Sequence, residues 1–196
     1  MAARRFSQAI AEGDGISVLV EVPDGDAARA AAADGAEALV VRGDVRPVRE
    51  ATELPILWSA SGPIADAANA GADAFLVVVG NVHEDGDRLE RLHDEALGLG
   101  LDCVVEVRTE EELELALERL DPEIFLLAAL DDDDDRSPLD RALELLPDVP
   151  AGKLAIANVP VSGRDQVDEL ERAGVDAVIV GAGNVADLVG DAPPQV

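Results

Sequence analysis

The segment that most constrains the fold of this chain is 174–183, which reads Gly-Val-Asp-Ala-Val-Ile-Val-Gly-Ala-Gly. It consists of a glycine that ends a helix, a small residue, an acid, an alanine and a run of apolar residues. The same pattern occurs at 35–41 and 71–78, so we expect a repeated unit of one strand and one helix. Because these strands are apolar at consecutive positions, both of their faces must be covered, as in the parallel sheets of α/β proteins.

Strands and helices alternate along the whole chain, which predicts a closed (β/α)8 TIM barrel of near-minimal length with short loops. A short helix over 2–12 precedes the first strand. Thr109 is expected to cap the fifth helix, with Glu112 completing a capping box. The expected strands are 16–22, 38–41, 55–58, 74–79, 102–107, 124–130, 153–158 and 177–180, and the other helices are 27–34, 46–52, 63–70, 83–97, 138–146, 164–173 and 185–189.

The 196 residues, 48% of them hydrophobic, are enough for one core, and no linker divides them, so we expect a single domain over 1–196. Aromatic residues are scarce, and a core of Ala, Val, Leu and Ile suits the layered interior of a small barrel. The one cysteine, Cys103, lies in an apolar strand and is interpreted as a buried hydrophobic residue rather than a nucleophile.

The formal net charge of −27 arises from 42 acidic and 15 basic residues. Such a surface disfavours nucleic acids and anionic membranes as partners. It resembles the proteins of salt-accumulating organisms, and an acidic protein from an ordinary habitat is the alternative. The sequence contains neither an apolar run of membrane-spanning length nor an apolar signal-peptide core, which predicts a cytoplasmic location.

Several segments, in order, carry a resemblance to a known family. The most specific are 99–107, Leu-Gly-Leu-Asp-Cys-Val-Val-Glu-Val, which is followed by Thr-Glu-Glu-Glu-Leu at 109–113, and the segment 173–181. Together with 5–10, 20–22, 54–57 and 70–74, they resemble indole-3-glycerol phosphate synthase, the carboxy-lyase that closes the indole ring in tryptophan biosynthesis. The resemblance implies the same barrel and a phosphorylated, carboxylated substrate.

The departures from this family fall on its catalytic positions. The family's first strand ends Glu-X-Lys, and here the lysine position is Pro23. Its third strand carries Arg-Lys-Asp, and here 58–60 reads Trp-Ser-Ala. The asparagine pair after the sixth strand is replaced by alanines at 128–129, and the Glu-Ser-Gly turn after the seventh by Asn-Val-Pro at 158–160. Ring closure needs a general acid and a cation for the carboxylate, and neither lysine remains.

Glu21, Glu106 and Gly181 survive from the family pattern. Glu21 and Glu106 end their strands at the C-terminal mouth of the barrel, where they are candidate catalytic acid and base. The alternative is that both carboxylates are inherited and now only hydrogen-bonded or solvated. Gly181, Ala182 and Gly183 form a candidate phosphate-binding turn before a short helix, or merely a tight turn. The proline at 160 weakens the phosphate site because it lacks an N–H.

Four other features bear on function. The five aspartates at 131–135 are interpreted as a solvated acidic loop, with a Mg²⁺ or Ca²⁺ site as the alternative. His83 and His93 are expected at the surface, and no metal site or cofactor is predicted. Trp58 is expected to fill the mouth or to stack on a ligand, with filling favoured.

Three functions remain open from the sequence. The first is a catalytically eroded member of the family that binds a small phosphorylated metabolite. The second is an active carboxy-lyase of tryptophan biosynthesis. The third is a non-enzymatic acidic barrel that binds cations or a partner.

Overall fold

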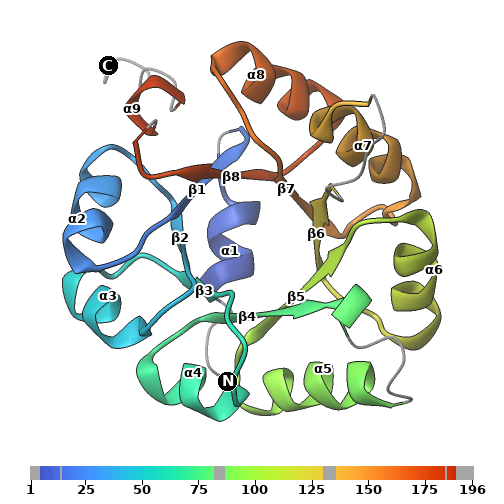
Figure 1. Ribbon diagram of the computed structural model, residues 1–196, viewed down its shortest axis with the longest axis horizontal. Helices are drawn as coiled ribbons and strands as arrows, with labels where there is room; N and C mark the ends of the chain where they lie inside the picture. The colour runs from blue at the N-terminus through green and yellow to red at the C-terminus, as the bar shows by residue number, and fades with distance from the viewer. Residues whose placement is uncertain (1–4, 14, 82–86, 130–135, 184, 189–196) are drawn as a thin grey trace.

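The computed structural model describes residues 5–13, 15–81, 87–129, 136–183 and 185–188. Its strands form one closed, all-parallel barrel in which each strand pairs with the next in sequence and β8 returns to β1 (Figure 1). The predicted (β/α)8 fold is therefore confirmed. The strands are β1 Ser17–Glu21, β2 Ala38–Val41, β3 Ile56–Trp58, β4 Ala74–Val78, β5 Asp102–Val107, β6 Ile124–Ala128, β7 Leu154–Asn158 and β8 Ala177–Gly181.

The helices form an outer ring around the strands, except α1, which lies over the barrel axis (Figure 1). Most boundaries agree with the expected ranges within three residues. The helices are α1 Arg5–Ala11, α2 Gly25–Ala33, α3 Val45–Ala51, α4 Ile64–Ala70, α5 Arg88–Gly98, α6 Glu110–Arg119, α7 Pro138–Leu145, α8 Arg164–Ala173 and α9 Val185–Leu188, with short 3-10 helices at Val79–Asn81 and Leu146–Asp148.

The repeated sequence pattern corresponds to a repeated local structure. Gly35, Gly71 and Gly174 have φ of 95°, 91° and 100°, a left-handed conformation that glycine adopts without strain. In each copy, the N–H of the following residue donates to a carbonyl five residues earlier, which ends the helix in a Schellman-type turn. A further turn of this kind occurs at Gly100, where φ is 79° and the N–H of Leu101 donates to the carbonyl of Ala96. These turns deliver the chain from each helix directly into the next strand.

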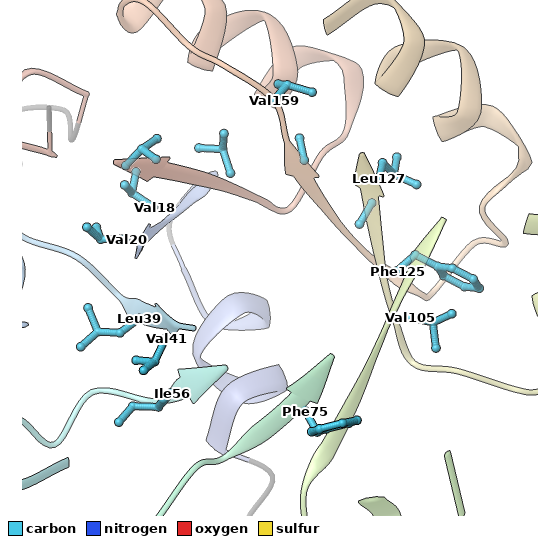
Figure 2. Packing of buried hydrophobic residues seen from close by; sticks show 14 of the residues in the cluster. Val18, Val20, Leu39, Val41, Ile56, Phe75, Val105, Phe125, Leu127 and Val159 are labelled. Atoms are coloured by element: carbon cyan, nitrogen blue, oxygen red, sulfur yellow. The ribbon is translucent and has the colours of Figure 1, made fainter. Parts of the chain in front are cut away.

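Alternating strand residues separate the core into two clusters. Residues such as Val18, Leu39, Phe75 and Phe125 point outward from the strands toward the helices (Figure 2). The intervening residues, including Leu19, fill the barrel interior. Both faces of the strands are thus buried, as the consecutive apolar residues predicted.

The N-terminal helix α1 closes the bottom of the barrel, the end at which the strands begin. Its Phe6 and Ile10 are buried and belong to the interior cluster. The backbone N–H of Ser7 donates to Oδ2 of Asp102 at 2.9 Å, which fixes α1 against the start of β5. A ligand therefore has to approach the interior from the other end, the mouth.

Candidate functional site

The inward-facing residue at or just beyond the end of each strand contributes to the mouth. Each of these residues lies two positions after a residue of the interior cluster or one packed against it, so the alternation of the strand directs it inward. This set, here named the mouth ring, consists of Glu21, Arg42, Ser59, Val78, Glu106, Ala128, Asn158 and Gly181. Glu21 and Glu106 thus occupy the predicted end of the barrel, while their catalytic role remains a prediction.

Glu106 is buried at the end of β5 and forms an ion pair with Arg108. Oε1 of Glu106 accepts from Nε of Arg108 at 2.7 Å and lies 2.5 Å from its Nη2. The side chain of Glu106 is 8% exposed and that of Arg108 is 29% exposed. The backbone of Arg108 is also fixed, because its N–H donates to Oε2 of Glu112 at 2.8 Å.

The contact between Arg108 and Glu112 corrects a detail of the predicted capping box. The Thr109 hydroxyl does accept from the N–H of Glu112 at 3.2 Å, as expected. The Glu112 carboxylate, however, reaches back to Arg108 and not to Thr109. The cap of α6 therefore also holds a residue of the mouth in place.

Glu21 is likewise paired with an arginine. Its Oε1 lies 2.9 Å from Nε of Arg42, the residue that follows β2. Both side chains are more exposed than those of the Glu106 pair, so solvent screens this interaction. The two candidate carboxylates are each engaged by a guanidinium.

A cavity of about 620 Å³ opens at the mouth on the side of β2 to β5. Arg42, Arg88 and Arg108 line it, and we name it the arginine cavity. Ser59, Ser61, Asn81 and Asn158 add polar groups to its wall. The sequence interpretation missed these arginines, although Arg42 and Arg108 continue the two-residue alternation of β2 and β5.

A second cavity of about 480 Å³ lies on the opposite side of the mouth, next to β7, β8 and β1. It is lined by Glu21, Pro160 and Gly181 among others, and we name it the glycine-turn cavity. Glu21 and Gly181 are register partners on adjacent strands, so a carboxylate stands beside the predicted phosphate-binding turn. The helix that follows, α9, has only four residues.

Comparisons with known proteins extend these observations. The sequence profile named indole-3-glycerol phosphate synthase matches residues 44–186. An indole-3-glycerol phosphate synthase from Nocardioides sp. is 36% identical over 192 residues, covering 86% of this chain and 70% of that protein. The chain belongs to the indole-3-glycerol phosphate synthase family. A second relative of the same name, from Geobacillus sp., is 30% identical over 144 residues, covering 71% of this chain and 55% of that protein.

The chain thus spans only about half the length of the Geobacillus relative.

Solved structures agree on the fold. N-acetylmannosamine-6-phosphate 2-epimerase from Clostridium perfringens superposes with a TM-score of 0.71 at 16% identity, covering 87% of each chain. The tryptophan synthase α-subunit from Pyrococcus furiosus gives 0.64 at 18% identity, covering 86% of this chain and 88% of that one.

The departures from the indole-3-glycerol phosphate synthase pattern lie at the mouth. Ser59, at the position that the resemblance assigns to a lysine, lines the arginine cavity. Ala128 is buried against the barrel interior, and Asn158 borders both cavities. Pro23, two residues beyond Glu21, is exposed at the rim. Charged and polar groups of the family are therefore replaced around one rim of the barrel.

Trp58 does not fill the mouth, and this prediction is wrong. Its ring lies 5.7 Å from that of Phe75, which belongs to the helix-facing cluster, and its Nε1 donates to the carbonyl of Gly43 at 3.0 Å. Because Leu57 points into the barrel, the next residue must point toward the helices. Trp58 accordingly packs on the outside of β3.

His93 is buried and not at the surface as expected. It lies on the same face of α5 as Leu89 and Ala96, which are also buried. Cys103 is buried as predicted. Burial, with a smaller contribution from Asp102, raises the pKa of its thiol to about 12. A thiol in this state is no nucleophile at neutral pH.

Two predicted features lie outside the described residues, namely His83 and the acidic loop 131–135. Within the described ranges, no three potential metal-ligating side chains gather into a metal site. Nor does this part of the chain contain a helix with the length and apolar character needed to cross a bilayer.

Proposed function

We propose that this protein is a divergent barrel of the indole-3-glycerol phosphate synthase family that has lost the ring-closing reaction and binds a small phosphorylated metabolite at its mouth. The observation that carries the proposal is that Pro23 and Ser59 stand at the mouth in the two positions that the resemblance assigns to lysine. The ion pair with Arg108 engages Oε1 of Glu106, so one carboxylate oxygen remains to act on a substrate, but it would act without the cations that the reaction needs.

The size of the expected loss in rate follows from the missing charges. Each donor that stabilises a developing charge is commonly worth about 2.7 to 4 kcal/mol, or about 10² to 10³ in rate. Pro23 and Ser59 stand at two positions that the resemblance assigns to lysine. Losing both would lower the rate by several orders of magnitude, even with two glutamates retained.

The test is an assay of the purified protein with the family's phosphorylated, carboxylated substrate. We expect no formation of indole-3-glycerol phosphate above background, alongside a known active member of the family as the positive control. Turnover comparable to that control, abolished by Glu106→Gln, would overturn the proposal.

A second candidate is an active carboxy-lyase of tryptophan biosynthesis. It is favoured by the 36% identity to the Nocardioides relative that carries this name. The three arginines of the cavity would then supply the positive charge that the lysines provide elsewhere in the family. The same assay decides between the two, and a gene location among tryptophan genes would support the second.

A further inference from the structure

The arginine cavity is an electrostatic exception in an acidic protein. The chain carries a formal charge of −27, yet three arginines line this one cavity. Among the described lining residues, Glu106 is the single carboxylate. Arg42 and Arg108 are ion-paired with Glu21 and Glu106, so the described residues around this cavity carry only a small excess of positive charge, which in a concave site attracts anions.

Two of these arginines come from neighbouring parts of the barrel. Arg88 begins α5, which follows β4, and Arg108 follows β5, the strand paired with β4. The contacts of Arg108 with Glu106 use Nε and Nη2 and do not involve Nη1. Arg88 also interacts with another group of the protein. A guanidinium has five N–H donors, so each of these two arginines can keep its present contact and still donate to a ligand.

The glycine-turn cavity has the opposite character. None of its described lining residues is an arginine or a lysine, and Glu21 is one of them. Pro160 supplies no N–H at the neighbouring turn. An anion placed beside Gly181 would therefore lie next to a carboxylate and would have fewer backbone donors.

We propose that the anionic group of the ligand is bound by Arg88 and Arg108 in the arginine cavity, and not by the turn at 181–183. The ligand class is a small hydroxylated phosphate ester, such as a sugar phosphate. Ser59, Ser61, Asn81 and Asn158 line the same cavity and are suited to bind its hydroxyl groups. The volume of about 620 Å³ lies within the range of small-molecule sites. This inference rests on the proposed binding function and locates it.

The experiment measures ribose 5-phosphate binding by calorimetry at low salt, with ribose and inorganic phosphate as comparison ligands. Arg88→Gln and the double variant Glu106→Gln/Arg108→Gln remove the arginines. The double variant avoids leaving Glu106 buried and unpaired, a change that would destabilise the fold. Arg172→Gln, an exposed position at the end of α8, is the matched control. Circular dichroism verifies that each variant is folded.

Gly181→Ala probes the competing site. A methyl group at Gly181 meets no atom within 4 Å, so the substitution fits the fold but obstructs close approach to the turn. We expect each arginine variant to weaken ribose 5-phosphate binding at least about tenfold, the usual worth of a charge-assisted hydrogen bond. We expect Gly181→Ala and Arg172→Gln to bind as the unmodified protein does, and ribose to bind much more weakly.

Three outcomes would overturn this inference. Weakening by Gly181→Ala with intact binding in the arginine variants would assign the anion to the glycine turn and leave the proposed function standing. Equal affinity for ribose and its phosphate would show that the anion is not recognised. Absence of binding by the unmodified protein to either phosphate would remove the ligand-binding part of the proposed function as well. The loss of lyase activity is decided separately, by the turnover assay.

Discussion

Asp176 and Ala155 exchange two hydrogen bonds at the bottom of the barrel. Oδ2 of Asp176 accepts from the N–H of Ala155 at 2.7 Å, and the N–H of Asp176 donates to the carbonyl oxygen of Ala155 at 2.9 Å. Asp73 binds Ile56 in the same way, with distances of 3.0 and 2.9 Å. Glu37 does so with Val18, at 3.2 and 3.1 Å. The acid of the repeated sequence pattern is therefore a structural clamp between adjacent strands.

Removal of this clamp is expected to destabilise the fold. Asp176→Ala leaves the buried N–H of Ala155 without its acceptor, which commonly costs about 1 to 3 kcal/mol. Asp176→Asn keeps a side-chain oxygen and should cost less. Urea unfolding measures both, with Asp148→Ala at an exposed position as the control. Equal stability of Asp176→Ala and the control would mean that the carboxylate contributes nothing to the fold.

The buried thiol predicts an alkaline loss of stability. The pKa of Cys103 is raised to about 12 in the folded protein, whereas an exposed thiol in the unfolded chain ionises near its ordinary value. Above that ordinary value the unfolded state releases a proton that the folded state keeps, so the free energy of unfolding falls as pH rises toward 12. The slope approaches about 1.4 kcal/mol per pH unit.

The fall in stability can be assigned to Cys103 because few other side chains titrate in the same pH range. The sequence has no tyrosine and one lysine. Urea unfolding at pH values from about 8 to 11 should show the decline, and Cys103→Ala should largely abolish it. The thiol should also react with a disulfide reagent only in denaturant. Rapid labelling of the native protein at neutral pH would contradict the deep burial of this side chain.

The net charge predicts stabilisation by salt. Repulsion among the excess carboxylates is screened as the Debye length falls from about 30 Å at 0.01 M to about 3 Å at 1 M salt. The melting temperature should therefore rise between 0.01 and 1 M KCl. The double variant Glu114→Gln/Glu118→Gln removes one repelling i, i+4 pair of exposed residues on α6. It should raise the melting temperature at 0.01 M KCl and reduce the rise in melting temperature between 0.01 and 1 M KCl. A melting temperature that does not depend on the KCl concentration would show that charge repulsion does not destabilise the fold.

Restoring the two missing lysines is expected to return little lyase activity. In Pro23→Lys/Ser59→Lys, Glu106 still accepts both contacts from Arg108. The loops around the mouth also stay short, so water remains at the reacting centre. Product formation with the family's substrate should stay near background. A rise of several orders of magnitude would mean that the two cations alone separate this chain from an active enzyme.

Much of the fold could be predicted because the dominant signals are local. The glycine turns, the acids that follow them and the apolar strands all lie within about ten residues of sequence, and each has one favourable structure. The pairing of the acid at 176 with Ala155 was not predicted, since the two residues meet only when β7 and β8 become neighbours.

The candidate site was harder to predict, because its chemistry depends on which side chains face one another across the barrel. Glu21 and Glu106 were placed correctly at the mouth, but their arginine partners were not anticipated. Here a usable signal existed, since strict alternation from Val104 directs both Glu106 and Arg108 inward. The same rule, applied to Leu57, would have placed Trp58 outside the barrel.

The burial of His93 could also have been read from the sequence. Leu89, His93 and Ala96 recur at the spacing of one helical face, so the histidine shares the buried side of α5. The charged neighbours of His93 misled the interpretation, because they occupy the other faces of the same helix.

One face of each strand packs against the helices, and the other ends in a residue of the mouth ring. This separation bears on how such a barrel changes during evolution. The helix-facing cluster contains none of the mouth-ring residues. Exchanges within that ring alter the charge and hydrogen-bonding groups offered to a ligand, while the packing between strands and helices is preserved. An old specificity can be lost and a new one selected through a succession of well-folded ancestors. A library randomised at the ring positions other than the buried Glu106 and Ala128 should consist largely of folded proteins.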